Sequence, residues 1–135
     1  MQVLAVDPGT HKCGVAIVAN ETPPRTLYRA VVATRDLPQA VRGLLQENTI
    51  DAVLIGDATH TREAQAALRP LLAAETPFHL VPEAFTSERA RMRWRTENPP
   101  RNLWERLLPG FRVPDCCVDD YAAVILAEQF LSSLR

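Results

Sequence analysis

Residues 2–19 read QVLAVDPGTHKCGVAIVA, two apolar runs joined by a polar turn. The first run ends at Val6 and is followed directly by Asp7-Pro8-Gly9-Thr10, a combination typical of a turn. The second run, Cys13–Ala19, is apolar again. This pattern predicts a β-hairpin with an aspartate at the end of its first strand.

The rest of the chain extends this hairpin into a mixed α/β pattern. A third strand at Thr26–Ala33 makes an antiparallel meander, after which helices and strands alternate. The further expected elements are a helix capped by Asp36, a strand at Asp51–Gly56, a helix from Thr61 with an apolar face reaching Leu72, a strand at Pro77–Pro82, a short helix at Thr86–Arg95, an irregular loop at Glu97–Pro114 with one turn near Leu103–Leu108, and an amphipathic helix at Val118–Leu134. The order predicts a mixed five-stranded sheet with helices on both faces.

Composition favours one globular domain over residues 1–135. The 135 residues suit a single core, and 47% hydrophobic with 23% charged residues argue against disorder. Neither an 18-residue apolar run nor a basic leader is present, so we expect no membrane span and no signal peptide. Three scattered cysteines (Cys13, Cys116 and Cys117) predict reduced, mostly buried thiols and a cytoplasmic location.

Charge is unevenly distributed along the chain. The formal net charge is -1, yet Thr86–Arg112 holds seven Arg and three Glu, a net +4 that leaves the remainder at -5. This segment fits a track for a phosphate backbone, on which Arg89 and Arg93 share a helix face. Trp94 and Trp104 could stack on unpaired bases. The alternative is a solvated Arg-rich helix with both Trp in the core.

Three acidic residues stand where a core or its rim is expected. Asp7 and Glu83 each follow an apolar strand, and Asp119 lies on the apolar stripe of the last helix, with Ala123, Leu126 and Phe130 within roughly 40° at about 100° per residue. We expect the first strand beside the fourth and the fifth beside the fourth, so that the strand ends share one rim. Taken singly, the three acids could be a turn residue, a solvated strand end and a helix cap.

Converging carboxylates need compensation for their mutual repulsion. Hard oxygen ligands favour Mg²⁺ or Mn²⁺, and two such ions can support phosphodiester cleavage. Asp7, Glu83 and Asp119 are therefore the predicted catalytic and metal-binding residues. Asp120 points about 100° away from Asp119 on the helix and is the weaker candidate. Thr10 and Lys12, near Asp7 in sequence, are expected to contact the scissile phosphate.

At these residues the chain resembles the YqgF/RuvX-like proteins of the RNase H-like superfamily, relatives of the RuvC Holliday-junction resolvases. The similar stretches are AVDPGTHKCGVAI at 5–17, DAVLIG at 51–56, VPEAFTSERA at 81–90 and VDDYAAVILAEQFL at 118–131. The resemblance spans nearly the whole chain and keeps the motifs in order. The Asp-x-Gly-Thr turn alone also occurs in sugar kinases and actin-like ATPases, but those need two such domains.

The resemblance implies an RNase H-like fold with Asp7, Glu83 and Asp119 as catalytic acids. It implies a metal-dependent nuclease that either resolves Holliday junctions or matures the 5′ end of pre-16S rRNA, with nucleic acid as partner and a homodimer favoured by the junction reading. The expected nucleic-acid contacts are Thr10, Lys12, Thr86, Arg89 and Arg93.

Two departures from the family pattern support an alternative. Pro82 and Ala84 flank Glu83 where the family commonly has an acid and an Arg, and the loop at 56–60 is short. The alternative is a non-catalytic nucleic-acid or ribosome-binding module on a decayed nuclease fold.

Overall fold

The computed structural model describes residues 1–57, 61–82, 86–97 and 119–134, with the backbone alone at residues 86–88, 91, 94, 95 and 119. Its elements in chain order are β1 (Gln2–Asp7), β2 (Lys12–Ala19), β3 (Arg25–Ala33), the 3₁₀ helix η1 (Thr34–Asp36), α1 (Leu37–Glu47), β4 (Ala52–Asp57), α2 (Thr61–Leu68), the 3₁₀ helix η2 (Arg69–Leu71), β5 (Phe78–Pro82), α3 (Thr86–Glu97) and α5 (Asp119–Ser133).

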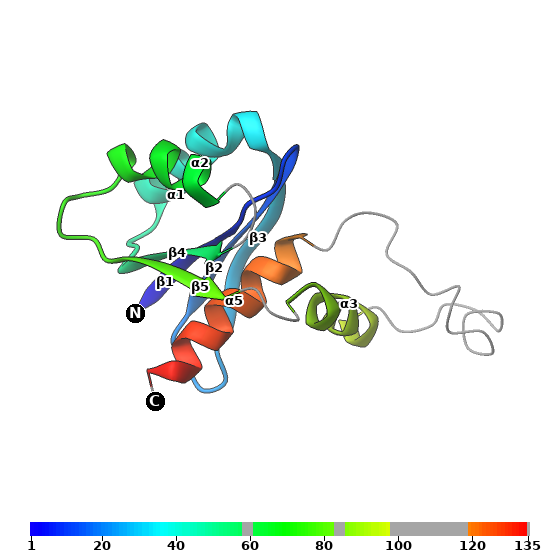
Figure 1. Ribbon diagram of the computed structural model, residues 1–135. Coiled ribbons are helices and arrows are strands. Elements are labelled where there is room, and N and C mark those ends of the chain that lie inside the picture. The colour runs from blue at the N-terminus through cyan, green and yellow to red at the C-terminus, as the bar shows by residue number, and fades with distance from the viewer. Residues whose placement is uncertain (58–60, 83–85, 98–118, 135) are drawn as a thin grey trace.

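The five strands form one mixed sheet in the order β3-β2-β1-β4-β5 (Figure 1). The pairs β1–β2 and β2–β3 are antiparallel, whereas β4 is parallel to both β1 and β5. The predicted mixed five-stranded sheet is confirmed, as are the expected neighbours of the first and fourth strands. Because β1, β4 and β5 run in the same direction, their carboxyl ends lie at one edge of the sheet.

Helices cover both faces of this sheet, as predicted (Figure 1). Strand alternation decides which residues face which layer. In β1, Val3 and Ala5 pack in the core beneath α5, while Leu4 and Val6 pack in the second core beneath α1 and α2. All four side chains are fully buried. The central strand therefore contributes to two cores at once.

The last helix differs from its predicted amphipathic character. Every residue from Tyr121 to Ala127 is buried. One side, including Ala123 and Leu126, packs on the sheet, and another, including Ala122 and Ile125, packs with Ala90 of α3. α5 is thus enclosed between two layers along its first half, because α3 covers the side that would otherwise face solvent.

Two helix boundaries also differ from expectation. Asp36 stands at the N-cap of α1 but makes no capping side-chain hydrogen bond; it is the last residue of η1, and its backbone is helical instead of extended as in most N-caps. α2 ends at Leu68 instead of reaching Leu72, and a 3₁₀ turn that contains Pro70 follows. Proline lacks a backbone N–H and disfavours an α conformation in the residue before it. The expected turn at 103–108 lies outside the described residues.

Two further findings concern burial and membranes. Cys13 is buried as a free thiol, as predicted, whereas Cys116 and Cys117 lie outside the described residues. Across the ranges that the structure describes, none of the helices has the length and apolar character that a membrane crossing requires.

The packing of α5 predicts a large effect of truncating Leu126, which is fully buried against the sheet. We expect Leu126→Ala to lower the free energy of unfolding by about 2–5 kcal/mol, because the removed side-chain atoms leave a cavity at a fully buried position. Leu134→Ala is the control, since Leu134 is 53% exposed, and it should change stability by less than about 0.5 kcal/mol. Urea denaturation measures both. Equal, small effects would contradict the packing described for α5.

Candidate active site

Asp7 is the last residue of β1 and lies opposite Gly14 of β2. Alternation along the strand places it on the same face as Val3 and Ala5, the face that α5 covers. The side chain is half-buried. Asp7 therefore stands where the core beneath α5 reaches the carboxyl edge of the sheet.

The turn after Asp7 is tightly held. A Cβ atom on Gly9 would collide with the carbonyl oxygen of Lys12, so the close approach of the two backbones requires glycine. The hydroxyl of Thr34 donates to the carbonyl of Gly9 at 2.9 Å, and the Thr34 amide donates to the carbonyl of His11 at 2.9 Å. These bonds join the hairpin turn to η1 and limit movement of the residues beside Asp7.

The carboxyl end of β5 reaches the same edge. His79 and Val81 lie on the α5 face, since the His79 ring is 4.9 Å from the Phe130 ring and Val81 belongs to the core beneath α5. Glu83 comes two residues after Val81 and lies outside the described residues. The structure thus brings β5 to the predicted rim without describing its glutamate.

The two candidate aspartates, Asp119 and Asp120, are the first two residues of α5. Asp120 accepts a hydrogen bond from the Arg29 guanidinium at 3.0 Å and one from the Tyr121 amide at 2.9 Å. The Arg29 guanidinium also lies 4.2 Å from the centre of the Tyr121 ring. Asp120 is therefore engaged with β3.

Asp119 is the first residue of α5, and its side chain is not described. Ala123 and Leu126, which follow it by four and seven residues, are fully buried against the sheet. The predicted stripe along this helix is confirmed at those two positions, and Phe130 packs against the same core.

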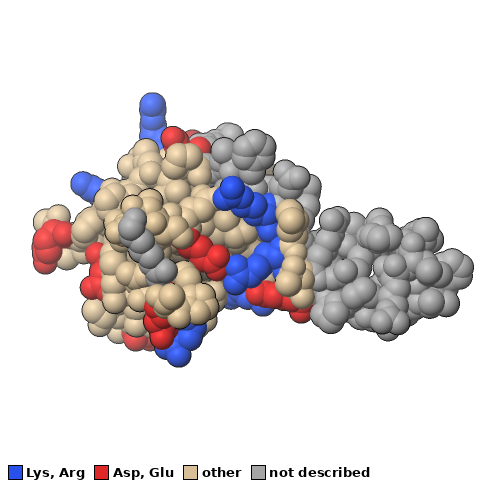
Figure 2. Space-filling model, turned by 90° about the horizontal axis from the view of Figure 1, so that it is seen from below, with Lys and Arg blue, Asp and Glu red and all other residues tan. Residues whose placement is uncertain are grey.

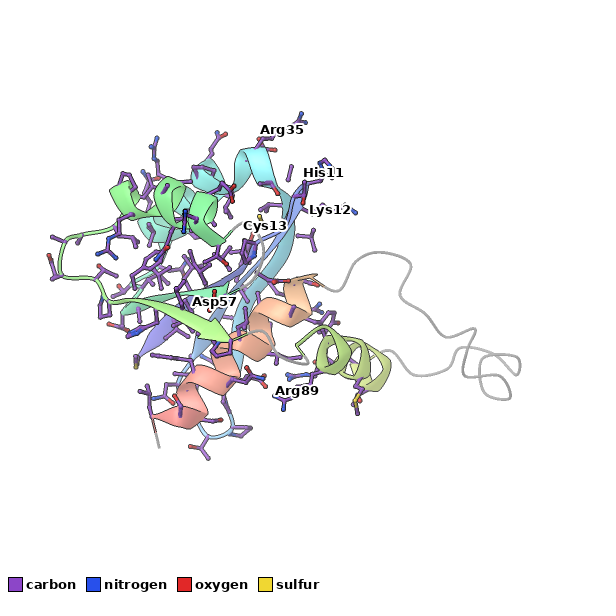
Figure 3. The ribbon with its side chains drawn as sticks, in the orientation of Figure 1. His11, Lys12, Cys13, Arg35, Asp57 and Arg89 are labelled. Carbon is purple, nitrogen blue, oxygen red and sulfur yellow. The ribbon has the colours of Figure 1, made fainter. Side chains whose placement is uncertain are left out.

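The predicted nucleic-acid contacts fall in two places. Thr10 and Lys12 are exposed at the tip of the β1–β2 hairpin, while Arg89 is exposed on α3, far from that tip (Figure 3). Thr86 begins α3, and its side chain is not described. Trp94, Trp104 and the segment 98–118 likewise lie outside the described side chains.

Arg93 lies in an ion-pair network. Its guanidinium is 2.8 Å from Glu128 of α5 and 3.0 Å from Glu97 of α3. Arg89 and Arg93 line one cavity of about 640 Å³ between these helices, in keeping with the expected shared face. Figure 2, a view from below, shows basic and acidic side chains next to each other on the described surface. That Arg93 binds phosphate stays a prediction.

The network shifts two ionisation equilibria. Burial of Arg93 acts to lower the pKa of its guanidinium, but the hydrogen bonds to Glu128 and Glu97 outweigh it and the pKa is raised. Burial acts to raise the pKa of Glu97, but hydrogen bonds from Arg93 and Tyr121, with the charges of Arg93 and Arg29, hold it below its ordinary value. Both groups are stabilised in their charged forms.

Asp57, the last residue of β4, is a further strand-end carboxylate that was not singled out from the sequence. It is exposed and lies opposite Pro82 at the same edge of the sheet (Figure 3). Alternation with Val53 and Ile55 places it on the α1 and α2 face, the opposite one to Asp7. The signal was present, because Asp57 follows an apolar run just as Asp7 does. Among the residues that the structure describes, no three His, Cys, Asp or Glu side chains gather as metal ligands would.

Arg29 was missed for a different reason. It belongs to an exposed edge strand and lies 91 residues from Asp120 in sequence. No local pattern in the sequence links two positions so far apart.

Comparison with known proteins supports the fold. No protein-family model matches the chain, and no curated protein matches it. The Thermus thermophilus RuvC structure is similar with a TM-score of 0.65 and 18% identity, over 99% of this chain and 96% of that chain. A complex of T. thermophilus RuvC with a Holliday junction substrate gives 0.60 and 17%, over the same shares.

A Fowlpox virus resolvase in complex with substrate Holliday junction DNA gives a TM-score of 0.64 and 13% identity, over 99% of each chain. At these identities the likeness is one of fold. The protein is an α/β protein with the RNase H-like fold of these structures, and its sheet follows the same mixed five-stranded plan. This is the fold that the sequence resemblance implies.

The lowered pKa of Glu97 predicts a pH-dependent contribution to stability. A carboxylate with a depressed folded-state pKa stabilises the protein above its unfolded pKa and loses this effect as pH falls through the folded value. We therefore expect Glu97→Gln to be less stable than wild type at neutral pH, with the difference vanishing as pH drops below the ordinary glutamate range. Urea denaturation at a series of pH values measures this. A difference that stays constant down to acidic pH would contradict the ion pairing.

Proposed function

We propose that this protein is a divalent-metal-dependent nuclease that hydrolyses phosphodiester bonds in branched nucleic acid, with Asp7, Glu83 and Asp119 as its catalytic carboxylates. The observation that carries the proposal is the position of Asp7. It is half-buried at the carboxyl end of the central strand, on the face covered by α5, the helix that begins with Asp119.

The donor chemistry suits Mg²⁺ or Mn²⁺. Carboxylate oxygens are hard ligands, and a half-buried aspartate at the edge of an apolar core gains most from an adjacent cation. Asp7, Glu83 and Asp119 would hold two such ions. When bound, these ions would supply Lewis-acid stabilisation and lower the pKa of a coordinated water.

The remaining residues position the site. The Arg29–Asp120 bond and the packing of α5 set the place of the helix start relative to the sheet. The tight turn at Gly9 sets Asp7 relative to the hairpin tip. Thr10 and Lys12 are exposed at that tip, where a hydroxyl and an ammonium group can donate to phosphate oxygens.

Branched DNA is the substrate that we favour. Two of the similar structures, from T. thermophilus and Fowlpox virus, contain Holliday junction DNA. A homodimer is part of this proposal, because symmetric resolution requires two cuts. The proposal is tested against two alternatives. One is maturation of pre-16S rRNA, which the sequence resemblance also implies, and the other is a non-catalytic binding module.

The central test compares two strand-end aspartates with Mn²⁺ on a four-way DNA junction and on structured RNA. Wild type should cleave the junction, and EDTA should abolish cleavage. Asp7→Asn should reduce the rate by roughly a thousandfold, because metal ions supply several kcal/mol of transition-state stabilisation. Asp57→Asn is the matched control and should retain activity, since Asp57 lies on the other face of the sheet.

Each other result selects an alternative. Junction cleavage that survives Asp7→Asn, in protein free of contaminating nuclease, would falsify the active-site assignment. Cleavage of RNA alone would favour rRNA maturation. Binding of either substrate without any cleavage would favour the non-catalytic module.

A second test concerns the hairpin tip. We expect Lys12→Gln to weaken junction binding and to reduce the slope of log K against log salt by about one, the value for one lost phosphate contact. Arg42→Gln, at an exposed position of α1, should leave the slope unchanged. Fluorescence anisotropy with EDTA present measures binding without cleavage. An unchanged slope for Lys12→Gln would remove Lys12 from the interface.

A further inference from the structure

A second pocket lies on the opposite face of the sheet from α5. Its volume is about 420 Å³, and three walls enclose it. The first is the turn Pro8–Thr10, which directly follows Asp7. The second is the start of α1 with Arg35 before it, and the third is one face of α2. We call it the turn pocket.

The turn pocket is held open by the fold. Thr34 ties the turn to η1 through its hydroxyl bond to Gly9, and Thr61 anchors the start of α2 by donating to the carbonyl of Gly56 at 2.8 Å. Its base is formed by Cys13 and Leu37, which are 1% and 2% exposed. A ligand would therefore enter a preformed site, and the free-energy cost of ordering that site on binding would be small.

The lining specifies the shape and polarity of a ligand. Pro8, Pro38 and Ala67 contribute small apolar groups to the lining, against which a flat ring can pack. Arg35 and Glu63 supply one cation and one carboxylate, both on exposed residues. A suitable ligand combines a planar, weakly polar ring with an amino group for Glu63 and an anion for Arg35. A nucleobase with its own phosphate has these features.

The place of the pocket favours a base that belongs to the substrate strand. Lys12 pairs with Ala33 in the β2–β3 ladder, and Arg35 follows Ala33 by two residues. His11, Lys12 and Arg35 consequently lie at one end of the molecule (Figure 3). A strand whose phosphates follow this basic end passes the mouth of the turn pocket.

From this juxtaposition we infer that the turn pocket binds one unpaired nucleobase that carries an exocyclic amino group, from the nucleic-acid strand that occupies the hairpin tip. The inference rests on the nucleic-acid binding that is part of the proposed function, and it does not depend on cleavage. A branched or locally unpaired substrate can offer a free base, whereas an intact duplex must first pay to unstack one. The pocket would thus favour substrates with an unpaired base, and among the bases it would prefer adenine, cytosine or guanine to thymine.

The test uses a short oligothymidylate with one central 2-aminopurine, in EDTA so that cleavage plays no part. Among the described residues that line the pocket, none has an aromatic ring to quench the probe, so 2-aminopurine fluorescence should rise as the base leaves its neighbours. Ala67→Phe fills the pocket and should weaken binding on the order of tenfold, the loss expected when one bound base is excluded. Ala66→Phe is the matched control, because Ala66 is the exposed neighbour of Ala67 on α2.

A second variant keeps the inference testable if Ala67→Phe fails to fold. Glu63→Met replaces an exposed side chain and should bring the affinity for the 2-aminopurine strand down to that for plain oligothymidylate. Equal binding by Ala67→Phe and Ala66→Phe, an unchanged preference in Glu63→Met, or no fluorescence rise in wild type would each overturn the inference.

The two proposals fail in different ways. If the fluorescence rise is present and Mn²⁺-dependent cleavage is absent, the nuclease assignment is wrong and the turn pocket stands. If cleavage is present and the rise is absent, the turn pocket is wrong and the nuclease assignment stands. Asp7→Asn should keep the fluorescence rise while losing cleavage.

Discussion

The enclosure of α5 between the sheet and α3 is the packing constraint on which the remaining structure depends. Every residue from Tyr121 to Ala127 is buried, and Ala122, Ala123 and Ala127 allow the helix to approach both neighbours closely. Arg29 reaches from β3 to hold the first turn through Asp120. Since the helix begins at Asp119, these contacts together set where that residue stands relative to Asp7. A shift of α5 would disturb its packing on the sheet and on α3 together with two ion pairs, Arg29–Asp120 and Arg93–Glu128.

Strand alternation gives the sheet two faces, each with its own core. Asp7 and Asp57 end neighbouring parallel strands, but one belongs to the α5 side and the other to the α1 and α2 side. The proposed metal site and the turn pocket therefore lie on opposite faces of the sheet. The turn at Pro8–Thr10 connects them, because it directly follows Asp7 and lines the turn pocket. Chemistry and base selection would thus share one short, rigid segment.

The distribution of charge bears on how the proposed substrate would be recognised. Arg93 belongs to the basic segment of the sequence, yet it is bound to Glu128 and Glu97 and helps to hold α3 on α5. Part of the apparent basic track is therefore committed within the fold. Combined with a formal net charge of -1, this means that the proposed nuclease would recognise branched structure instead of binding any nucleic acid strongly.

Local pattern was sufficient for the order of strands and helices, the placement of Asp7 at a strand end and the sheet-facing stripe of Ala123 and Leu126, because periodicity and turn residues act over a few neighbours. It was sufficient even for the strand adjacency, through the general rules of parallel connections. Tertiary structure alone decided that Arg29 holds Asp120, that α3 encloses α5, and that Pro8, Arg35 and Ala67 line one pocket. Each of these joins residues distant in sequence, and such contacts exist only after the chain has packed.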